Sequence, residues 1–491
     1  MSDTTVIAKS GIRVSIRIKP LDNPSEELAV KPNEHNVDNS IDVETNFCDM
    51  SSFTYGHIHW STGNGKIDPI YATQEDVFND VGKPIVESAL QGFNCCVFAY
   101  GQTGSGKTYT MMGGGKDEQT QEGLIPRICR AILVGQDSDP SVIKTTFEVS
   151  YVELYLEKVK DLLGPATASN LKVRENPTTG PFVEGCSAHE VATYPQLLEL
   201  LEHGNSNRHV AATKMNEVSS RSHVIFTLKV TQTKVDLDPP DAGIALEAGA
   251  GAGAGAAGTG GGFNSHLSSS KNNIVTCKVN LVDLAGSESV KLAATSGERL
   301  KEGASINKSL LTLGRVIKAL AAQAQGQKKA RRSSLVTPQE DKEKPNSGSK
   351  RRGSMGSGHN HGHNSSSETE DEPFHTHTPT SSGSAAVIPY RESVLTFLLK
   401  ESLGGNSSSA LIAAVRPGKA YLEETMSTLR FAAQAGRVEN KPVVNETNPY
   451  IKTISAVSAV DYLSLSLSLS VCTGICGCIL LEPPLMPLCV L

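Results

Sequence analysis

The stretch NCCVFAYGQTGSGKT, residues 94–108, decides the fold of this 491-residue chain. Its first half, residues 95–100, is apolar throughout and has the length of a strand buried on both faces. Its second half, residues 101–108, matches G-x-x-x-x-G-K-[ST], a loop whose glycines let backbone N–H groups converge on a phosphate at the start of a helix. The Lys107 ammonium would reach the outer phosphates, and the Thr108 hydroxyl would ligate Mg²⁺. This stretch therefore predicts a site for a nucleoside triphosphate.

Segments with strand and helix patterns alternate on both sides of this loop. Strands are predicted at residues 12–20, from residue 146 onward, and at residues 223–234, 274–284 and 411–415. Helices are predicted at residues 72–92, 125–134, 195–203, 306–322, 394–403 and 423–438. This alternation around a phosphate loop predicts an α/β fold, with a central β sheet and helices on both of its faces.

Charge and cysteine usage restrict the class of protein. The formal net charge is −6 and the sequence pI is about 6.1, which argues against nucleic acid as a partner. The ten cysteines are scattered, and Cys95, Cys96 and Cys277 lie in apolar strand-like segments, as reduced thiols of a cytosolic protein do. Residues 1–10 lack the basic start and apolar core of a secretory signal. We therefore expect a cytoplasmic protein.

Two segments have almost no core-forming side chains. Residues 235–271 contain the run GAGAGAGAAG, and residues 323–386 begin with nine basic against three acidic residues and end with a histidine-rich, acidic part. Such segments cannot offset the entropy lost on ordering, so we expect two disordered insertions. The histidines lack the spacing of an ordered metal site, and no metal is expected there.

Two later stretches carry the chemistry that triphosphate hydrolysis needs. Residues 216–223, NEVSSRSH, place hydroxyls, a guanidinium and an imidazole just before a strand. Residues 282–288, VDLAGSE, place Asp283 at the end of an apolar strand, where it could hold Mg²⁺ through water, and then a glycine whose N–H can approach a phosphate. In this order, the three motifs resemble the phosphate loop, switch I and switch II of the kinesin motor domain.

The resemblance covers residues 12–448 outside the two insertions. Among kinesins it is closest to the kinesin-3 subfamily, at residues 208–216, 295–303 and 394–399. It implies the kinesin variant of the phosphate-loop NTPase fold and ATP with Mg²⁺ as ligands. Mg²⁺ would be held by Thr108 and Ser220 directly and by Asp283 through water. The residues implied to bind ATP are Arg17, Pro20, Gly101, Gln102, Thr103, Gly104, Ser105, Gly106, Lys107, Thr108 and Tyr109.

The resemblance also implies a group of residues that act in hydrolysis. The Gly286 N–H would read the γ-phosphate. Arg221 would pair with Glu288 when switch I closes on switch II. Glu288, together with the backbone of Ser219, would relay the proton of the attacking water.

The partner implied by the resemblance is the microtubule, an acidic lattice. The contacts would come from a basic face on a net-acidic chain, made by Lys172, Arg174, Lys291, Arg299, Lys301, Lys308, Arg391 and Lys400. Residues 328–352 lie where kinesin-3 motors carry a lysine-rich loop, so we expect a weak, salt-sensitive tether. Two R-R-x-S sequences, ending at Ser334 and Ser354, are candidate phosphorylation sites that would cancel local positive charge.

The chain is expected to have four parts. Residues 1–11 form an extension, residues 12–440 the motor domain, residues 441–450 a neck-linker-like segment and residues 451–491 an atypical apolar tail. Pro442 lacks an N–H donor, and we expect it to perturb docking of the linker. The tail contains an uncharged span about long enough to cross a bilayer, but its serines and glycines favour a truncated end over a membrane helix. Without a heptad repeat, we expect a monomer with no membrane partner.

These observations predict an ATP-driven microtubule motor that moves toward the plus end and is located on microtubules in the cytoplasm. Two alternatives remain. One is an ATPase that remodels microtubule ends without walking, and the other is a non-catalytic microtubule-binding module. The intact set of Lys107, Thr108, Arg221, Gly286 and Glu288 speaks against the second alternative.

Overall fold

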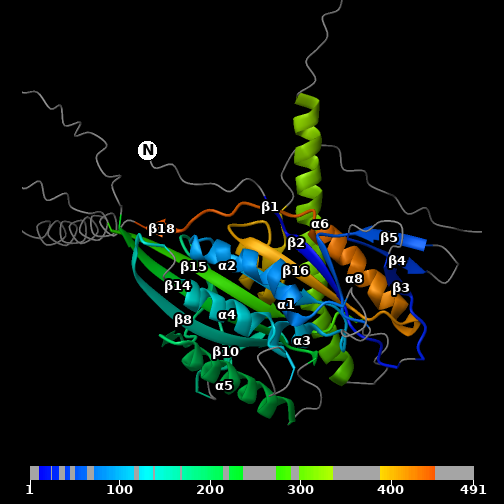
Figure 1. Cartoon of the computed structure of the whole chain (residues 1–491), viewed down its shortest axis with the longest axis horizontal. Coiled ribbons are helices and arrows are strands. Elements are labelled where there is room, and N and C mark those ends of the chain that lie inside the picture. Colours follow the sequence, from blue (N-terminus) through cyan, green and yellow to red (C-terminus); the bar gives the residue numbers. More distant parts are fainter. Residues whose placement is uncertain are drawn as a thin grey trace, which may run out of the picture.

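The computed structural model describes residues 10–23, 25–32, 39–44, 50–62, 71–114, 121–136, 139–165, 169–213, 220–235, 272–288, 298–334 and 387–447. These residues build one large sheet with helices on both faces, and the long helix α6 (Glu298–Ser334) projects past the sheet (Figure 1). The predicted α/β fold with a central sheet is confirmed.

The central sheet has eleven strands. They are β2 (Arg13–Ile18), β6 (His57–Trp60), β7 (Cys95–Tyr100), β8 (Val142–Tyr155), β9 (Lys158–Asp161), β10 (Ser169–Leu171), β13 (His189–Val191), β14 (His223–Val235), β15 (Asn272–Asp283), β16 (Ser408–Val415) and β18 (Glu446–Thr447). The main order is β10-β9-β8-β14-β15-β7-β16-β2-β6, with β13 beside β8 and β18 beside β15. Pairs from β15 through β7, β16 and β2 to β6 are parallel, and the others are antiparallel.

Each face of this sheet has its own set of helices. One apolar core includes residues of α1 (Gln74–Val77), α2 (Lys83–Leu90), α3 (Lys107–Met112), α4 (Leu124–Gly135) and α5 (Tyr194–Thr213). The opposite core includes residues of α6, α7 (Val394–Leu398) and α8 (Leu422–Ala435). Within the described residues, three small sheets lie outside the central one. They are β1 (Ser10–Gly11) with β17 (Glu439–Asn440), β3 (Val30–Pro32) with β4 (Ser40–Glu44) and β5 (Met50–Thr54), and the hairpin of β11 (Val173–Asn176) and β12 (Gly180–Val183). The short helical turns are η1 (Phe78–Gly82), η6 (Tyr390–Glu392), η7 (Lys400–Ser402) and η8 (Lys419–Tyr421).

Strand β7 lies at the centre and is buried along its whole length. Successive side chains of a strand point to opposite faces. Cys95, Val97 and Ala99 accordingly pack into the core of α1 to α5, whereas Cys96 and Phe98 pack into the core of α6 to α8. The continuous apolar run therefore reflects burial on both faces, as predicted.

Helix α6 departs most from the sequence prediction. A helix was predicted at residues 306–322 and disorder from residue 323, but the helix runs from Glu298 to Ser334. The prediction of disorder is therefore wrong for residues 323–334. These residues are mostly Ala, Gln, Lys and Arg, which have strong helix propensity, so helix α6 continues without a broad apolar face. The rest of both predicted insertions, residues 236–271 and 335–386, lies outside the described residues.

Other predicted bounds also shift. Helix α5 continues ten residues beyond the predicted end at residue 203, through Gly204 and Asn205, which are weak helix formers. The predicted helix at residues 72–92 contains the π-helical turn η1 between α1 and α2. The predicted helix at residues 394–403 is interrupted after Leu398 and continues as the turn η7. Strand β8 is followed by β9 as a hairpin, because Leu156 and Glu157 take positive φ angles.

The segment after α8 is docked along the sheet. Strand β17 pairs with β1, and β18 pairs with β15. Between them the N–H groups of Lys441 and Val443 donate to Gly405 O and Asn406 Oδ1. Pro442 lies between these two donors, so its missing N–H leaves both bonds in place, and the expectation that it perturbs docking is wrong for this arrangement.

Two predicted features lie outside the described residues. They are the extension before residue 10 and the apolar tail, residues 451–491. Among the helices that the structure describes, none is both long enough and apolar enough to cross a bilayer.

Candidate nucleotide site

The phosphate loop joins the carboxyl end of β7 to the start of α3. Gly101, Gly104 and Gly106 take φ angles of +148°, +75° and +98°, which L side chains rarely adopt. A Cβ on Gly101 would also lie 2.1 Å from Ala414 O. The glycines of the motif are therefore required by the turn itself, and they open the backbone toward the space in front of α3.

Lys107 is the first residue of α3, and it is 7% exposed. Its Nζ donates to Gln102 O at 2.8 Å. Burial lowers the pKa of Lys107, and the nearby carboxylates of Asp283 and Glu288 partly oppose that shift. The side chain is thus a largely desolvated cation, which attracts an anion more strongly than an exposed lysine does.

Asp283, at the end of β15, lies against the next residue of α3. The Thr108 hydroxyl donates to Asp283 Oδ2 at 2.7 Å. The other oxygen, Oδ1, is buried. A hydroxyl oxygen and a carboxylate, both of which are ligands that Mg²⁺ prefers, therefore lie together here. The carboxylate oxygen Oδ1 has no protein partner among the described residues.

Behind Asp283 lies a buried cation that the sequence analysis did not assign to the site. Arg208, on α5, is 7% exposed. Its Nη1 lies 3.7 Å from Asp283 Oδ2, and its Nε lies 3.8 Å from Glu153 Oε1. Glu153 is itself buried in β8. The available signal was Glu153, an acidic residue between the apolar Val152 and Leu154, but its partner Arg208 became clear only with the full length of α5.

His223, the last residue of the switch I motif, is fully buried at the start of β14. The N–H of Ala285 donates to its Nδ1 at 3.0 Å, and its Nε2 lies 2.8 Å from Ser309 Oγ. Because Nδ1 accepts, the proton of the neutral ring is on Nε2. Burial, with Lys107 and Arg208 nearby, lowers the pKa of His223 to about 3. The neutral ring therefore links switch II to helix α6.

Switch II lies directly against the phosphate loop. The Gly286 N–H donates to Ser220 O at 2.9 Å, and the Ser287 N–H donates to Gly101 O at 3.0 Å. The Glu288 carboxylate accepts from the Thr103 N–H at 2.8 Å and from the Thr103 hydroxyl. The three predicted segments are thus brought together by backbone and side-chain bonds.

The predicted base-binding residues lie beside the loop. The Arg17 guanidinium lies 5.1 Å from the centre of the Tyr109 ring and donates to Gln74 Oε1 at 2.6 Å and to Thr110 Oγ1 at 3.1 Å. Tyr109 is 40% exposed, while Pro20 is exposed at the end of β2. Strand β2 is buried, and its Arg17 contacts the Tyr109 ring.

A cavity of about 500 Å³ opens in front of these groups. It is lined by Thr103, Gly104, Gly106, Lys107, Thr108, Tyr109, Met112, Gly113, Asn205, Arg208, Ser220 and Leu284. Arg17 and Pro20 are not among them. Asn205 and Arg208 were missed as pocket residues because the predicted helix ended before them. Ser219 lies outside the described residues, and Arg221 follows Ser220 directly.

The predicted filament contacts whose side chains the structure describes are exposed, apart from the half-buried Lys400, and three of them are partly neutralised by neighbouring acids. Arg174 Nε lies 3.1 Å from Glu184 Oε2, and Arg391 Nη2 lies 2.7 Å from Glu175 Oε2. Lys400 pairs with the other oxygen of Glu175. Lys172 and Lys308 are exposed. Lys291 lies outside the described residues, and for Arg299 and Lys301 only the helical backbone of α6 is described.

The fold and the site define a phosphate-loop nucleotide-binding domain. Its loop follows the central parallel strand, and the cavity is lined by the buried Lys107 and by Thr108, which is bonded to Asp283. More specifically, the family model "Kinesin motor domain" matches residues 17–338 and 376–438. The chain belongs to the kinesin motor domain family, as predicted.

Curated relatives support the same assignment. The chain is 36% identical over 441 residues to kinesin-like protein KIF1B of Mus musculus, across 89% of this chain and 20% of that protein. It is 36% identical over 452 residues to kinesin-like protein unc-104 of Caenorhabditis elegans, across 91% of this chain and 23% of that protein. These relatives are kinesin-3 members, which confirms the predicted subfamily. The chain spans about a fifth to a quarter of their length.

Solved structures show the same fold. A fast kinesin, described with its ATPase mechanism and interactions with microtubules, is 30% identical with a TM-score of 0.63, over 89% of this chain and 95% of that one. A KIF14 dimer bound to AMP-PNP and a microtubule is 36% identical with a TM-score of 0.64, over 89% and 96% of the two chains.

Proposed function

We propose that this chain is an ATP-driven microtubule motor whose ATPase is stimulated by microtubules. The observation that carries the proposal is the meeting of three segments at one cavity. The phosphate loop and the start of α3 line it with Thr103, Lys107 and Thr108, and switch I lines it with Ser220. Switch II contacts this lining, because Asp283 is bonded to Thr108 and Glu288 to Thr103. Such a meeting is what allows a change at the γ-phosphate to move two segments of the protein.

The donor set suits Mg²⁺ with ATP. Thr108, Ser220 and Asp283 supply oxygen ligands, and the unused Oδ1 of Asp283 suits a water-mediated contact. Bound Mg²⁺ would neutralise charge on the phosphate oxygens. The backbone from Gly101 to Gly106 and the Lys107 ammonium would hold the phosphates, with Gln102, Ser105 and Tyr109 completing the loop and its base side.

The hydrolytic step is assigned to switch I and switch II. Glu288, with the Ser219 backbone, takes up the proton of the attacking water, and Arg221 holds Glu288 in position. In the present arrangement Glu288 is bonded to Thr103, and the Gly286 N–H donates to Ser220 O. Both bonds must be exchanged when Gly286 turns to the γ-phosphate and Arg221 pairs with Glu288. Hydrolysis is thereby coupled to movement of the switches.

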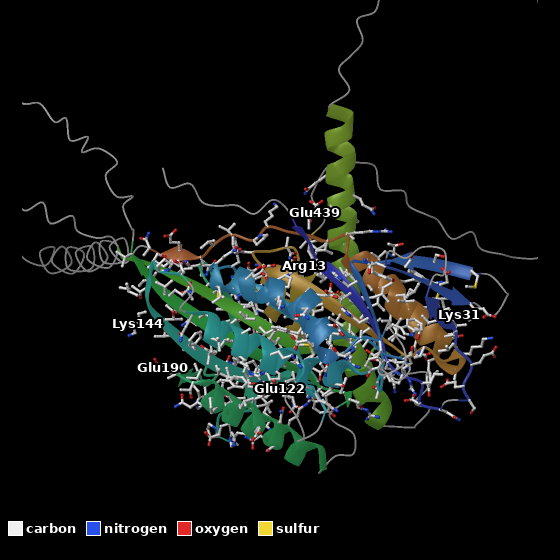
Figure 2. The ribbon with its side chains drawn as sticks, viewed as in Figure 1. Arg13, Lys31, Glu122, Lys144, Glu190 and Glu439 are labelled. Atoms are coloured by element: carbon white, nitrogen blue, oxygen red, sulfur yellow. The ribbon has the colours of Figure 1, made fainter. Side chains whose placement is uncertain are left out.

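Glu288→Ala tests this assignment. The variant should bind ATP with near-normal affinity and lose most of its turnover, by about 100-fold or more, because the proton acceptor is gone. Binding is measured by displacement of a fluorescent nucleotide and turnover by phosphate release. Glu190→Ala, an exposed residue on β13, is the matched control (Figure 2). Near-normal turnover of Glu288→Ala would remove the role.

Microtubule binding is assigned to the exposed basic face. Lys172 and Arg174 lie on or beside β11, and Arg391 and Lys400 lie on the turns next to α7. Lys291, Arg299, Lys301 and Lys308 follow switch II or lie on α6. The docked segment from β17 to β18 follows the last helix, an arrangement that supports plus-end movement. We further propose a location on cytoplasmic microtubules and a monomeric state of this chain.

One pair of measurements separates this proposal from its alternatives. A walking motor should show microtubule-stimulated ATP hydrolysis and should move microtubules when attached to a surface. An ATPase that remodels filament ends would hydrolyse ATP and shorten filaments without gliding. A passive module would bind microtubules with no stimulated hydrolysis.

A further inference from the structure

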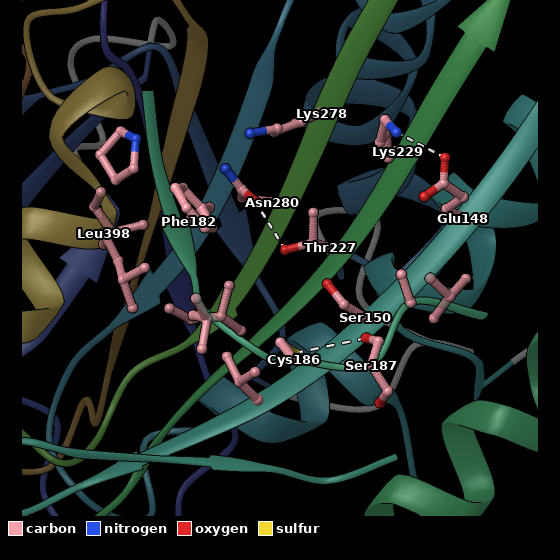
Figure 3. Close-up of a pocket in the computed structure, with 17 residues that line it drawn as sticks. Glu148, Ser150, Phe182, Cys186, Ser187, Thr227, Lys229, Lys278, Asn280 and Leu398 are labelled. Carbon is pink, nitrogen blue, oxygen red and sulfur yellow. Dashed lines mark hydrogen bonds and ion pairs between the residues drawn. The ribbon is translucent and has the colours of Figure 1, made fainter. Parts of the chain in front are cut away.

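A second cavity, of about 220 Å³, lies apart from the nucleotide site. Its floor is the face of β8, β14 and β15, and its walls are the hairpin strand β12 and helix α7 (Figure 3). None of the residues that line the nucleotide cavity lines this one. It is therefore a separate site.

The register of the three strands arranges the floor in rows. Glu148, Lys229 and Lys278 are cross-strand neighbours and form a charged row. The next row on the same face is polar and uncharged, and it consists of Ser150, Thr227 and Asn280. The row after that is apolar, and it includes Val152 of β8 and Ile225 of β14. Since a strand rises about 3.3 Å per residue, polarity falls from charged to apolar within about 13 Å.

The charged row carries a surplus positive charge. Lys229 Nζ lies 2.7 Å from Glu148 Oε1, so these two charges compensate each other. Lys278 Nζ donates to the carbonyl of Thr179 at 3.1 Å, and among the described residues no carboxylate lies within ion-pair distance of it. Burial lowers the pKa of Lys278, Lys229 lowers it further, and the more distant carboxylate of Glu401 partly opposes the shift. An anion at this end of the cavity would relieve that unfavourable burial.

The opposite end and the outer wall are apolar. Val152, Ile225, Val183 and Leu398 all line the cavity, and so does Phe182, whose ring is 41% exposed (Figure 3). An exposed ring beside a cavity offers a surface for stacking. In the middle row, Thr227 donates to Asn280 Oδ1 at 3.0 Å, which leaves the Asn280 amide hydrogens available to an acceptor.

We propose that this cavity binds a small aromatic carboxylate. The carboxylate contacts Lys278 and the Asn280 amide, and the ring lies between the sheet and Phe182. An apolar cavity of about 150 Å³ holds a benzene molecule, so the present volume of about 220 Å³ admits a ligand of about nine non-hydrogen atoms. A ligand of this size with one charged contact should bind with a dissociation constant of about 1 mM or tighter.

The test uses benzoate and its uncharged analogue benzamide, each of which has about nine non-hydrogen atoms. Binding is measured by calorimetry and ligand-observed NMR on the whole chain, with excess Mg²⁺–ADP to occupy the nucleotide site. The carboxylate should bind at least about tenfold more tightly than the carboxamide, because a charge-assisted hydrogen bond is lost in the amide. Equal binding of the two probes, or no carboxylate binding up to about 10 mM, would overturn the proposal.

Two matched variants locate the site. Lys278→Gln should weaken carboxylate binding about tenfold and leave carboxamide binding unchanged. Lys144→Gln removes the same charge from an exposed position of β8 outside the cavity, and it should leave both unchanged (Figure 2). Thermal unfolding midpoints check that both variants are folded. An unchanged carboxylate affinity in Lys278→Gln, or an equal loss in Lys144→Gln, would contradict the assignment.

Discussion

Two sets of basic side chains in this protein differ in their surroundings. Lys107 and Arg208 are each 7% exposed and meet the buried carboxylates of Asp283 and Glu153 at the nucleotide cavity. Arg174, Arg391 and Lys400, on the filament side, are paired with glutamates in contact with solvent. A buried charge acts in a low dielectric and is costly to leave alone, whereas water and salt screen an exposed pair.

Charge therefore acts differently at the nucleotide site and on the proposed filament side. At the nucleotide site a few cations are held in position, and each one has a large effect. On the proposed filament side we expect many cations to act together, each with a small effect that depends on salt. Four predictions test this contrast.

Arg208→Met should destabilise the protein by about 3–5 kcal/mol, because it leaves Glu153 and Asp283 as buried carboxylates without this cation. The free energy of unfolding is measured by urea denaturation. Arg174→Met removes the same charge from an exposed pair and should cost less than about 1 kcal/mol. Equal effects of the two variants would show that burial does not distinguish the two sets.

Acid should destabilise the protein through His223. Its pKa is about 3 in the folded state, below the ordinary value of 6.5, so only the unfolded chain takes up a proton as the pH falls below about 6.5. Stability from this group is complete above pH 6.5 and decreases by about 2 kcal/mol between pH 6.5 and 5. In His223→Gln, which can still accept from Ala285 and donate to Ser309, the decrease should be smaller by that amount. An identical pH dependence of the two proteins would rule out this contribution.

Deleting residues 328–352 should lower microtubule affinity at low salt, by several-fold, because it removes nine basic residues against three acidic ones. Co-sedimentation at two salt concentrations measures the effect, which should shrink as salt increases. The first part of this segment belongs to α6, so helix content is compared by circular dichroism. No change at low salt would count against the tether.

Glu175→Gln should raise microtubule affinity at low salt by about twofold, because Arg391 and Lys400 lose their shared acidic partner. Glu190→Gln changes the charge equally at an exposed position of β13 and serves as the control (Figure 2). Equal microtubule affinities of the two variants would show that the ion pairs with Glu175 do not limit the filament contacts of Arg391 and Lys400.

Local sequence was informative where one short segment carries both the structure and the chemistry. The run from Cys95 to Thr108 contains its own strand, its own glycines with positive φ and its own cation. The same holds for Asp283, because this aspartate directly follows the apolar residues of its own strand in the chain. Helix α6 shows the limit, because its last residues follow helix propensity and were predicted as disordered from charge and the lack of an apolar face.

The phosphate-loop fold, the kinesin motor domain family and the three motifs of the nucleotide site could be predicted from the amino-acid sequence, because each depends on short runs of contiguous residues. Only the tertiary structure decided that Arg208 reaches Asp283 and Glu153, that Glu288 is bonded to Thr103, and that Lys278 lies at the charged end of a separate cavity. These contacts join residues far apart in the chain, and whether a charge is buried or screened depends on what the fold packs around it.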